Sequence, residues 1–158
     1  MTKFSIGDAV PDFTLESTEG VQRLSELVKK ADKGVIVYFY PRAMTPGCTT
    51  QACDFRDSLS SFMIHGYSVI GISPDSLDKL EKFRDKDAVN FPLASDVSHH
   101  VMEAWGAFGE KKNYGKIVQG VIRSSVVVDT DMRVMYAAYN VRAKGHVARL
   151  RKELGIDE

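Results

Sequence analysis

Apolar residues occur in short clusters whose spacing alternates between that of strands and that of helices. The run Val35–Tyr40 consists of β-branched and aromatic residues and is typical of a buried strand. The segment Pro41–Gly47 then breaks the pattern with two prolines and a glycine. Beyond it, apolar positions recur at helical spacing as far as Met63, and Gly66 is placed to end that helix. This region is therefore expected to fold as a strand, a tight turn and a helix.

The same alternation continues through the rest of the chain. The further elements expected are strands at Tyr67–Ile72, Phe91–Ala94, Ile122–Val128 and Arg133–Ala138, a helix opened by Pro74 and Asp75, a helix over Val101–Phe108, and a last amphipathic helix carrying Val147, Leu150 and Leu154. Asp75 is the expected N-cap of its helix. The last two strands are separated by residues 129–132 and should form a hairpin. Together these elements predict an α/β fold with a mixed central β-sheet flanked by helices.

Length and charge narrow the class of protein. The chain has 158 residues, which is the size of one domain, so a single domain over residues 1–158 is expected. Lys plus Arg and Asp plus Glu each number 21, and this zero net charge disfavours a nucleic-acid-binding protein. No apolar run approaches the ~20 residues of a membrane helix, and the first residues lack the apolar stretch of a secretory signal. A cytoplasmic location with no membrane partner is therefore expected.

Only two cysteines are present, Cys48 and Cys53. Two are too few for a disulfide-stapled scaffold, and in a reducing compartment a close pair points to redox chemistry or metal binding. The sequence contains no Cys-x-x-Cys or His-x3-His spacing, so neither a zinc site nor any other cofactor is expected.

Cys48 lies where the predicted helix begins. The first peptide N–H groups of a helix lack intrahelical partners, and the helix dipole is positive at that end. Both features favour an anion, so we expect the Cys48 thiol to have a pKa below the ordinary value of ~8.5. Because the thiolate is the nucleophilic form of cysteine, Cys48 is predicted to be reactive.

Cys53 lies five residues further on, about 140° around the helix from Cys48. In an intact helix their Cα atoms would be ~8.7 Å apart, whereas a disulfide needs roughly 4.4–6.8 Å. The two sulfurs can therefore bond only if the first turns unwind or bend. This predicts a redox-driven local unfolding over residues 48–54.

The segments Tyr38–Pro41 and Thr45–Cys48, followed by Cys53, resemble the peroxiredoxins, specifically the Q type, also called bacterioferritin comigratory proteins. The resemblance extends over nearly the whole chain and includes Gly7–Leu15, Val69–Ser73, Phe91–Leu93, Trp105–Gly106, Gly109–Lys111 and Gly120–Ser124. It implies a thioredoxin-like fold and the reduction of hydrogen peroxide and organic hydroperoxides. It also implies thioredoxin, or glutaredoxin, as the reductant and a monomer, with a weak dimer as an alternative.

The resemblance further implies roles for individual residues. Cys48 would be the peroxidatic cysteine and Cys53 the resolving cysteine of an intramolecular disulfide. Pro41 would shield the thiolate pocket, Thr45 would offer its hydroxyl to the peroxide, and Arg123 would reach in from a distant strand to stabilise developing charge. Three positions depart from the common pattern, with Gln51 in place of glutamate, Val126 in place of phenylalanine and Met132 in place of glycine.

Other interpretations of these residues stay open at this stage. The chain could be a thioredoxin-like thiol–disulfide oxidoreductase, although that activity normally uses Cys-x-x-Cys, or a non-enzymatic redox sensor or holdase. Trp105 is expected in the core or in the wall of a pocket, and His99 and His100 at an exposed helix start. The basic residues from Arg142 to Lys152, His146 among them, are expected on a solvated helix face.

Overall fold

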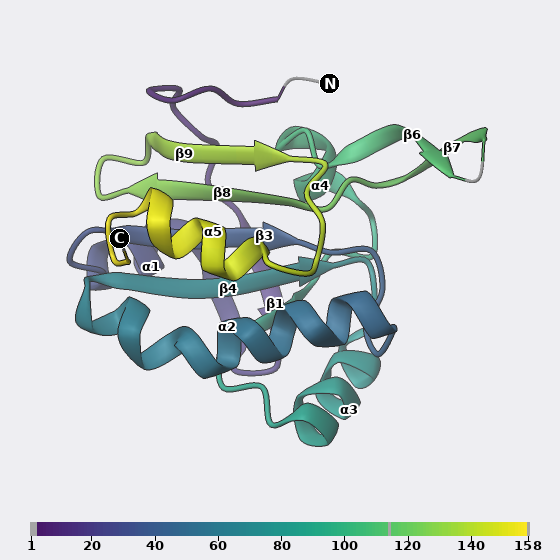
Figure 1. Ribbon diagram of the computed structural model, residues 1–158, viewed down its shortest axis with the longest axis horizontal. Helices are drawn as coiled ribbons and strands as arrows, with labels where there is room; N and C mark the ends of the chain where they lie inside the picture. Colours follow the sequence, from purple (N-terminus) through teal and green to yellow (C-terminus); the bar gives the residue numbers. More distant parts are fainter. Residues whose placement is uncertain (1–2, 114, 158) are drawn as a thin grey trace.

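Seven strands form one mixed sheet in the order β2-β1-β5-β4-β3-β8-β9 (Figure 1). The structure is a computed structural model that describes residues 3–113 and 115–157. The strands of this sheet are β1 (Thr14–Ser17), β2 (Gly20–Arg23), β3 (Gly34–Phe39), β4 (Tyr67–Ser73), β5 (Leu93–Ser95), β8 (Ser124–Asp129) and β9 (Val134–Tyr139). β3 pairs in parallel with β4 and antiparallel with β8, so the sheet is mixed as predicted.

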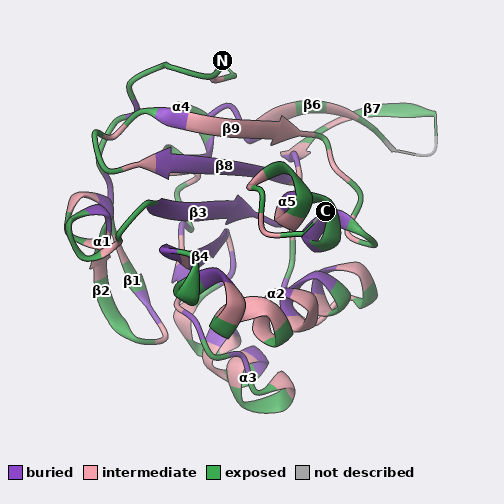
Figure 2. Ribbon diagram, turned by 60° about the vertical axis from the view of Figure 1, so that its left-hand side comes forward, coloured by how far each residue is buried: buried purple, intermediate pink, exposed green. Residues whose placement is uncertain are grey.

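Helices cover both faces of the sheet. They are α1 (Leu24–Lys30), α2 (Pro46–Ile64), α3 (Leu77–Asp87), α4 (His100–Ala104) and α5 (His146–Glu153). One apolar core lies under α2, α3 and α5, and a second lies under α1 and α4 together with the N-terminal segment. Figure 1 shows α2 and α5 in front of the sheet and α1 behind it. Because β3 lies between the two layers, all six of its residues are buried, which explains its unbroken apolar sequence (Figure 2).

The helix α2 carries the predicted apolar stripe and packs it against the sheet. Cys48, Ala52, Phe55 and Phe62 are all buried along its inner face. The Tyr38 ring of β3 stacks on Phe55, with 4.4 Å between ring centroids. The middle of α2 is therefore fixed relative to the strand that precedes the helix.

The end of α2 also follows the prediction. The last helical residue is Ile64, and Gly66 adopts a φ of +91°, a conformation in which glycine is favoured. The chain can therefore turn directly into β4.

Two details of the expected helices are wrong. The helix predicted over Val101–Phe108 is the short α4, because Gly106 turns the chain with a φ of +75° and Phe108 begins a strand. The expected cap of α3, Asp75, is not its N-cap. Ser76 occupies that position and accepts a hydrogen bond from the Lys79 amide.

Several elements are not predicted by the apolar pattern. These are β1, β2 and α1 near the N-terminus, and a separate two-stranded sheet of β6 (Phe108–Asn113) and β7 (Lys116–Val121). Trp105 is fully buried against aromatic rings, which confirms its core position. Within the described ranges, no helix combines the length and apolar character needed to cross a membrane.

Candidate active site

Cys48 occupies the third position of α2, and its side chain is 1% exposed. Thr45 is the N-cap, but its hydroxyl donates to the Arg42 carbonyl at 2.9 Å and caps no helix amide. No acidic residue lies in the first turn of α2. The positive end of the helix dipole therefore acts on the Cys48 sulfur without an opposing carboxylate in that turn.

Arg123 is distant from Cys48 in the sequence but contacts it in the folded protein. It lies between β7 and β8, just before the strand on which it was expected. Its Nη2 donates to the Cys48 Sγ at 3.2 Å, and its own carbonyl accepts a hydrogen bond from the Val141 amide at 2.9 Å. A fixed guanidinium thus faces the sulfur at the point where a nucleophilic displacement would develop charge.

Gln51 fixes the second branch of the same guanidinium. It is fully buried one turn after Cys48, and its Oε1 accepts a hydrogen bond from Arg123 Nη1 at 2.6 Å. The sequence marks this residue only as a departure from the common glutamate. Because the amide is neutral, it orients Arg123 without placing a negative charge beside the sulfur.

Cys53 is also on α2 but is not positioned to bond with Cys48. Both cysteines are free thiols, and the helix is continuous from Pro46 to Ile64. The Cα atoms are therefore ~8.7 Å apart, beyond disulfide range. Burial raises the pKa of the half-buried Cys53 thiol, and nearby Asp87 adds to this effect while Arg56 opposes it. Within residues 3–113 and 115–157, a cationic side chain donates a hydrogen bond to the Cys48 sulfur but not to the Cys53 sulfur.

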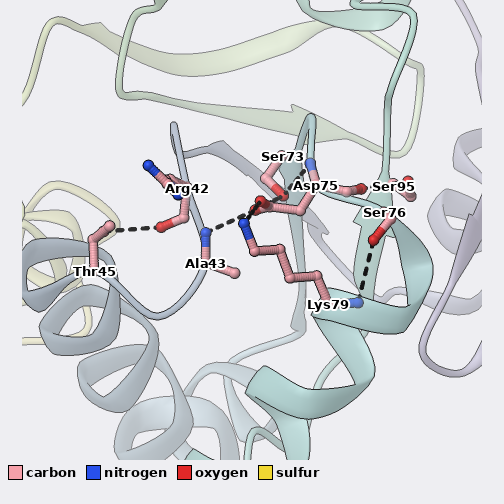
Figure 3. A network of polar contacts seen from close by, with 8 residues as sticks. All are labelled: Arg42, Ala43, Thr45, Ser73, Asp75, Ser76, Lys79 and Ser95. Atoms are coloured by element: carbon pink, nitrogen blue, oxygen red, sulfur yellow. Dashed lines mark hydrogen bonds and ion pairs between the residues drawn. The ribbon is translucent and has the colours of Figure 1, made fainter.

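Residues 41–45 connect β3 to α2 and are anchored at their centre. Pro41 and Thr45 are half-buried, and the amide of buried Ala43 donates to Asp75 Oδ2 at 2.7 Å (Figure 3). Met44 next to it adopts a left-handed φ of +65°. The turn that carries Pro41 and Thr45 is thus held by a carboxylate whose participation is not predicted by the sequence.

His146 departs from its expected position on a solvated face. It is 4% exposed, and its Nε2 lies 2.7 Å from the Ser125 hydroxyl. Burial and the positive charges of Arg123 and Arg149 together lower its pKa to about 4. The imidazole is therefore neutral at pH 7 and adds no charge to the site.

The other two departures from the common family pattern, Val126 and Met132, lie in β8 and in the turn after it. Val126 is fully buried in β8, where it pairs with Ala137 of β9. Met132 adopts a φ of +60° in the β8–β9 turn, a conformation that accounts for the common glycine there. Within residues 3–113 and 115–157, no three His, Cys, Asp or Glu side chains are grouped so as to hold a metal ion.

Comparison with known proteins gives a consistent result. A family model described as the AhpC/TSA family matches residues 6–137. A protein of Mycobacterium tuberculosis with a provisional peroxiredoxin name is 53% identical over 155 residues, covering 98% of each chain. Peroxiredoxin Bcp of Escherichia coli is 39% identical over 146 residues, covering 92% of each. A solved structure of the bacterioferritin comigratory protein of Xanthomonas campestris, a protein described as having alkyl peroxide reduction activity, is 30% identical with a TM-score of 0.82. The match covers 94% of this chain and 98% of that one.

Proposed function

The chain belongs to the AhpC/TSA family, among its Bcp or Q-type peroxiredoxins, and is a thiol-dependent peroxidase; on this premise we propose that Cys48 is the thiol that peroxide oxidises. This membership confirms both the resemblance and the thioredoxin-like fold inferred from the sequence. The observation that carries the assignment is the 3.2 Å contact between the Cys48 sulfur and Arg123 at the start of α2. Cys53 lacks such a contact, and its pKa is raised.

In the first step the Cys48 thiolate attacks one peroxide oxygen. A sulfur–oxygen bond forms while the O–O bond breaks, and the bonding pair leaves on the other oxygen, which takes up a proton to become water or an alcohol. Sulfur is oxidised to a sulfenic acid and the peroxide is reduced. The Arg123 guanidinium and the free amides at the start of α2 supply positive potential where the leaving oxygen develops charge.

Thr45 and Pro41 are proposed to bind the peroxide and to shield the thiolate, respectively. The Thr45 hydroxyl proton is engaged by the Arg42 carbonyl, so its oxygen lone pairs are left to accept the proton of a hydroperoxide. This refines the expectation from sequence, since Thr45 would receive a hydrogen bond from the substrate. Pro41, two residues after the end of β3, would limit the access of water to the thiolate.

In the second step Cys53 condenses with the sulfenic acid. The Cys53 thiol gives up its proton, a sulfur–sulfur bond forms, and the sulfenic oxygen leaves as water. An external dithiol then returns both cysteines to thiols. The continuous helix between the two cysteines supports a cycle in which the first turns of α2 unwind after oxidation. The same geometry disfavours the alternative of a thiol–disulfide oxidoreductase, which needs a disulfide that closes without remodelling.

Membership of the family implies peroxide substrates and a thioredoxin-type reductant. We propose that thioredoxin itself, or glutaredoxin, is that reductant. We further propose that alkyl hydroperoxides are substrates, as in the Xanthomonas campestris relative. The working unit would be a single-domain monomer, with a weak dimer as the alternative, located in the cytoplasm.

Peroxide consumption coupled to thioredoxin and its reductase tests these assignments. The Cys48→Ser variant should lose all turnover. The Cys53→Ser variant should consume one equivalent of peroxide and accumulate a sulfenic acid that a dimedone trap reveals by mass spectrometry. Retained turnover in Cys48→Ser would overturn the assignment of the nucleophile, and a Cys53→Ser variant without the trapped species would overturn the resolving role.

A further inference from the structure

Asp75 is a buried carboxylate in the connection between β4 and α3, with its side chain 6% exposed. Its Oδ2 accepts hydrogen bonds from the Ala43 amide at 2.7 Å and from the Ser73 hydroxyl at 2.8 Å. Its Oδ1 lies 3.7 Å from Lys79 Nζ. Figure 3 shows the carboxylate at the centre of these contacts, facing the turn before α2. A buried charge with this many partners is costly to disrupt, because each partner would be left unpaired.

The other groups around Asp75 hold it in place. The Ser73 hydroxyl also accepts from the Asp75 amide, and the Asp75 carbonyl accepts from the Ser95 hydroxyl at 2.6 Å. Ser73 itself is fully buried at the end of β4. The carboxylate is therefore fixed relative to the sheet, and its bond to Ala43 transmits that position to residues 41–45.

Residues 41–45 determine where α2 begins. The turn includes Met44 in a left-handed conformation, which an unbranched residue adopts at a cost of roughly 1 kcal/mol and which surrounding contacts must maintain. Thr45, at the other end of the turn, is the N-cap of α2, and Cys48 follows within one helical turn. A shift of Ala43 would therefore move the Cys48 sulfur relative to Arg123.

We propose that Asp75 is a positioning residue that clamps residues 41–45 through Ala43 and so favours the helical, peroxide-reactive start of α2 over the unwound form that closes the disulfide. The inference rests on the proposed roles of Cys48 and Cys53. The hydrogen bond from the Ala43 amide to Asp75 should therefore affect the two chemical steps in opposite directions. It accelerates oxidation of Cys48 and retards condensation of its sulfenic acid with Cys53.

Stopped-flow kinetics of the two steps test the proposal. In Asp75→Ala, the rate constant for oxidation of Cys48 by peroxide should fall about tenfold, the size expected for loss of a hydrogen bond to a charged acceptor. The rate constant for disulfide formation should rise several-fold, and the Ala43 amide should exchange its hydrogen faster. Asp75→Asn keeps the shape and one acceptor oxygen, so its changes should have the same direction and about threefold size.

Asp12→Ala provides a matched control, because the Asp12 carboxylate also accepts hydrogen bonds from a backbone amide and a serine hydroxyl, both of Ser25, and does not contact Asp75 or Ala43. Both of its rate constants should stay within about twofold of wild type. The proposal is overturned if the ratio of the two rate constants in the Asp75 variants equals that of wild type or of Asp12→Ala. If the wild-type protein fails to consume peroxide, the proposed function fails instead, so the two failures are distinguishable.

Discussion

The neutral state of His146 makes the stability of the protein depend on pH. The ring is buried against Phe55, at 6.5 Å between centroids, and contacts the Ser125 hydroxyl. Its pKa is lowered to about 4 by burial and by the charges of Arg123 and Arg149, whereas an unfolded histidine ionises near ~6.5. Between these values the unfolded chain binds more protons than the folded one. The stabilising contribution is therefore complete above about pH 6.5 and is lost as pH falls towards 4.

The size of this effect follows from the two pKa values. A difference of about 2.5 units corresponds to about 3 kcal/mol when it is fully expressed, and about 2 kcal/mol of it should be lost by pH 5. Carboxylates also titrate in this range, so the wild-type curve alone does not isolate the histidine. The His146→Gln variant removes the titrating group, and its amide can still hydrogen-bond with Ser125.

Urea unfolding of the reduced protein at pH 7.5, 6 and 5 measures the effect. Between pH 7.5 and 5, the wild type should lose about 2 kcal/mol more unfolding free energy than His146→Gln does. His100→Gln changes an exposed histidine at the start of α4 and should keep the wild-type dependence. If wild type and His146→Gln have the same pH dependence, the imidazole binds its proton as readily in the folded protein as in the unfolded chain, and the reasoning is refuted.

Three further predictions concern the site and its support. Arg123→Ala should slow oxidation of the Cys48 thiol by peroxide by about 10²–10³-fold in stopped-flow assays. Replacement of the exposed Arg149 by alanine should change this rate by less than about threefold. Equal losses in the two variants would mean that the net charge matters and the contact between Arg123 and Cys48 does not. Gly71→Ala should lower the unfolding free energy in urea by about 1–3 kcal/mol, because the added Cβ would lie 2.8 Å from Tyr38 Cζ, and an unchanged midpoint would contradict this packing. Amides of residues 48–54 should lose hydrogen-exchange protection in the disulfide form, and equal protection in both redox states would count against unwinding.

The elements predicted correctly share a strong local signal. β3 is apolar throughout, and the inner face of α2 carries a largely apolar stripe from Cys48 to Phe62, about four turns, so burial dictated both patterns. β6 and β7 instead form a separate sheet that is rich in charged and polar residues, and its described residues are exposed or half-buried apart from Val121. β2 at the edge of the main sheet is similarly exposed. Short edge strands need no apolar alternation, and the sequence therefore does not reveal them.

The active site could be predicted only in part, because some of its contacts join residues that are far apart in the sequence. The start of a helix after a buried strand places Cys48 by local rules, but Arg123 is 75 residues away and only the family resemblance paired them. His146 did carry a local signal that was not used. It lies four residues before Leu150, so the 3.6-residue period puts it on the buried face of α5. Asp75 was recognised as a polar residue near a helix start, but its partner Ala43 is a backbone amide, which sequence cannot identify.

The local sequence at the start of α2 explains how the helix can both hold and release Cys48. Residues 46–50 read Pro-Gly-Cys-Thr-Thr, and apart from proline at the first position these are poor helix formers. The first turn is thus held by contacts from outside the helix, chiefly from Arg123 to the sulfur and from Asp75 to the preceding turn. In the proposed cycle, oxidation would convert the Cys48 sulfur to a neutral sulfenic acid, and this would weaken its contact with Arg123. A helix start with little stability of its own could then unwind at small cost, as the proposed Cys48–Cys53 disulfide requires.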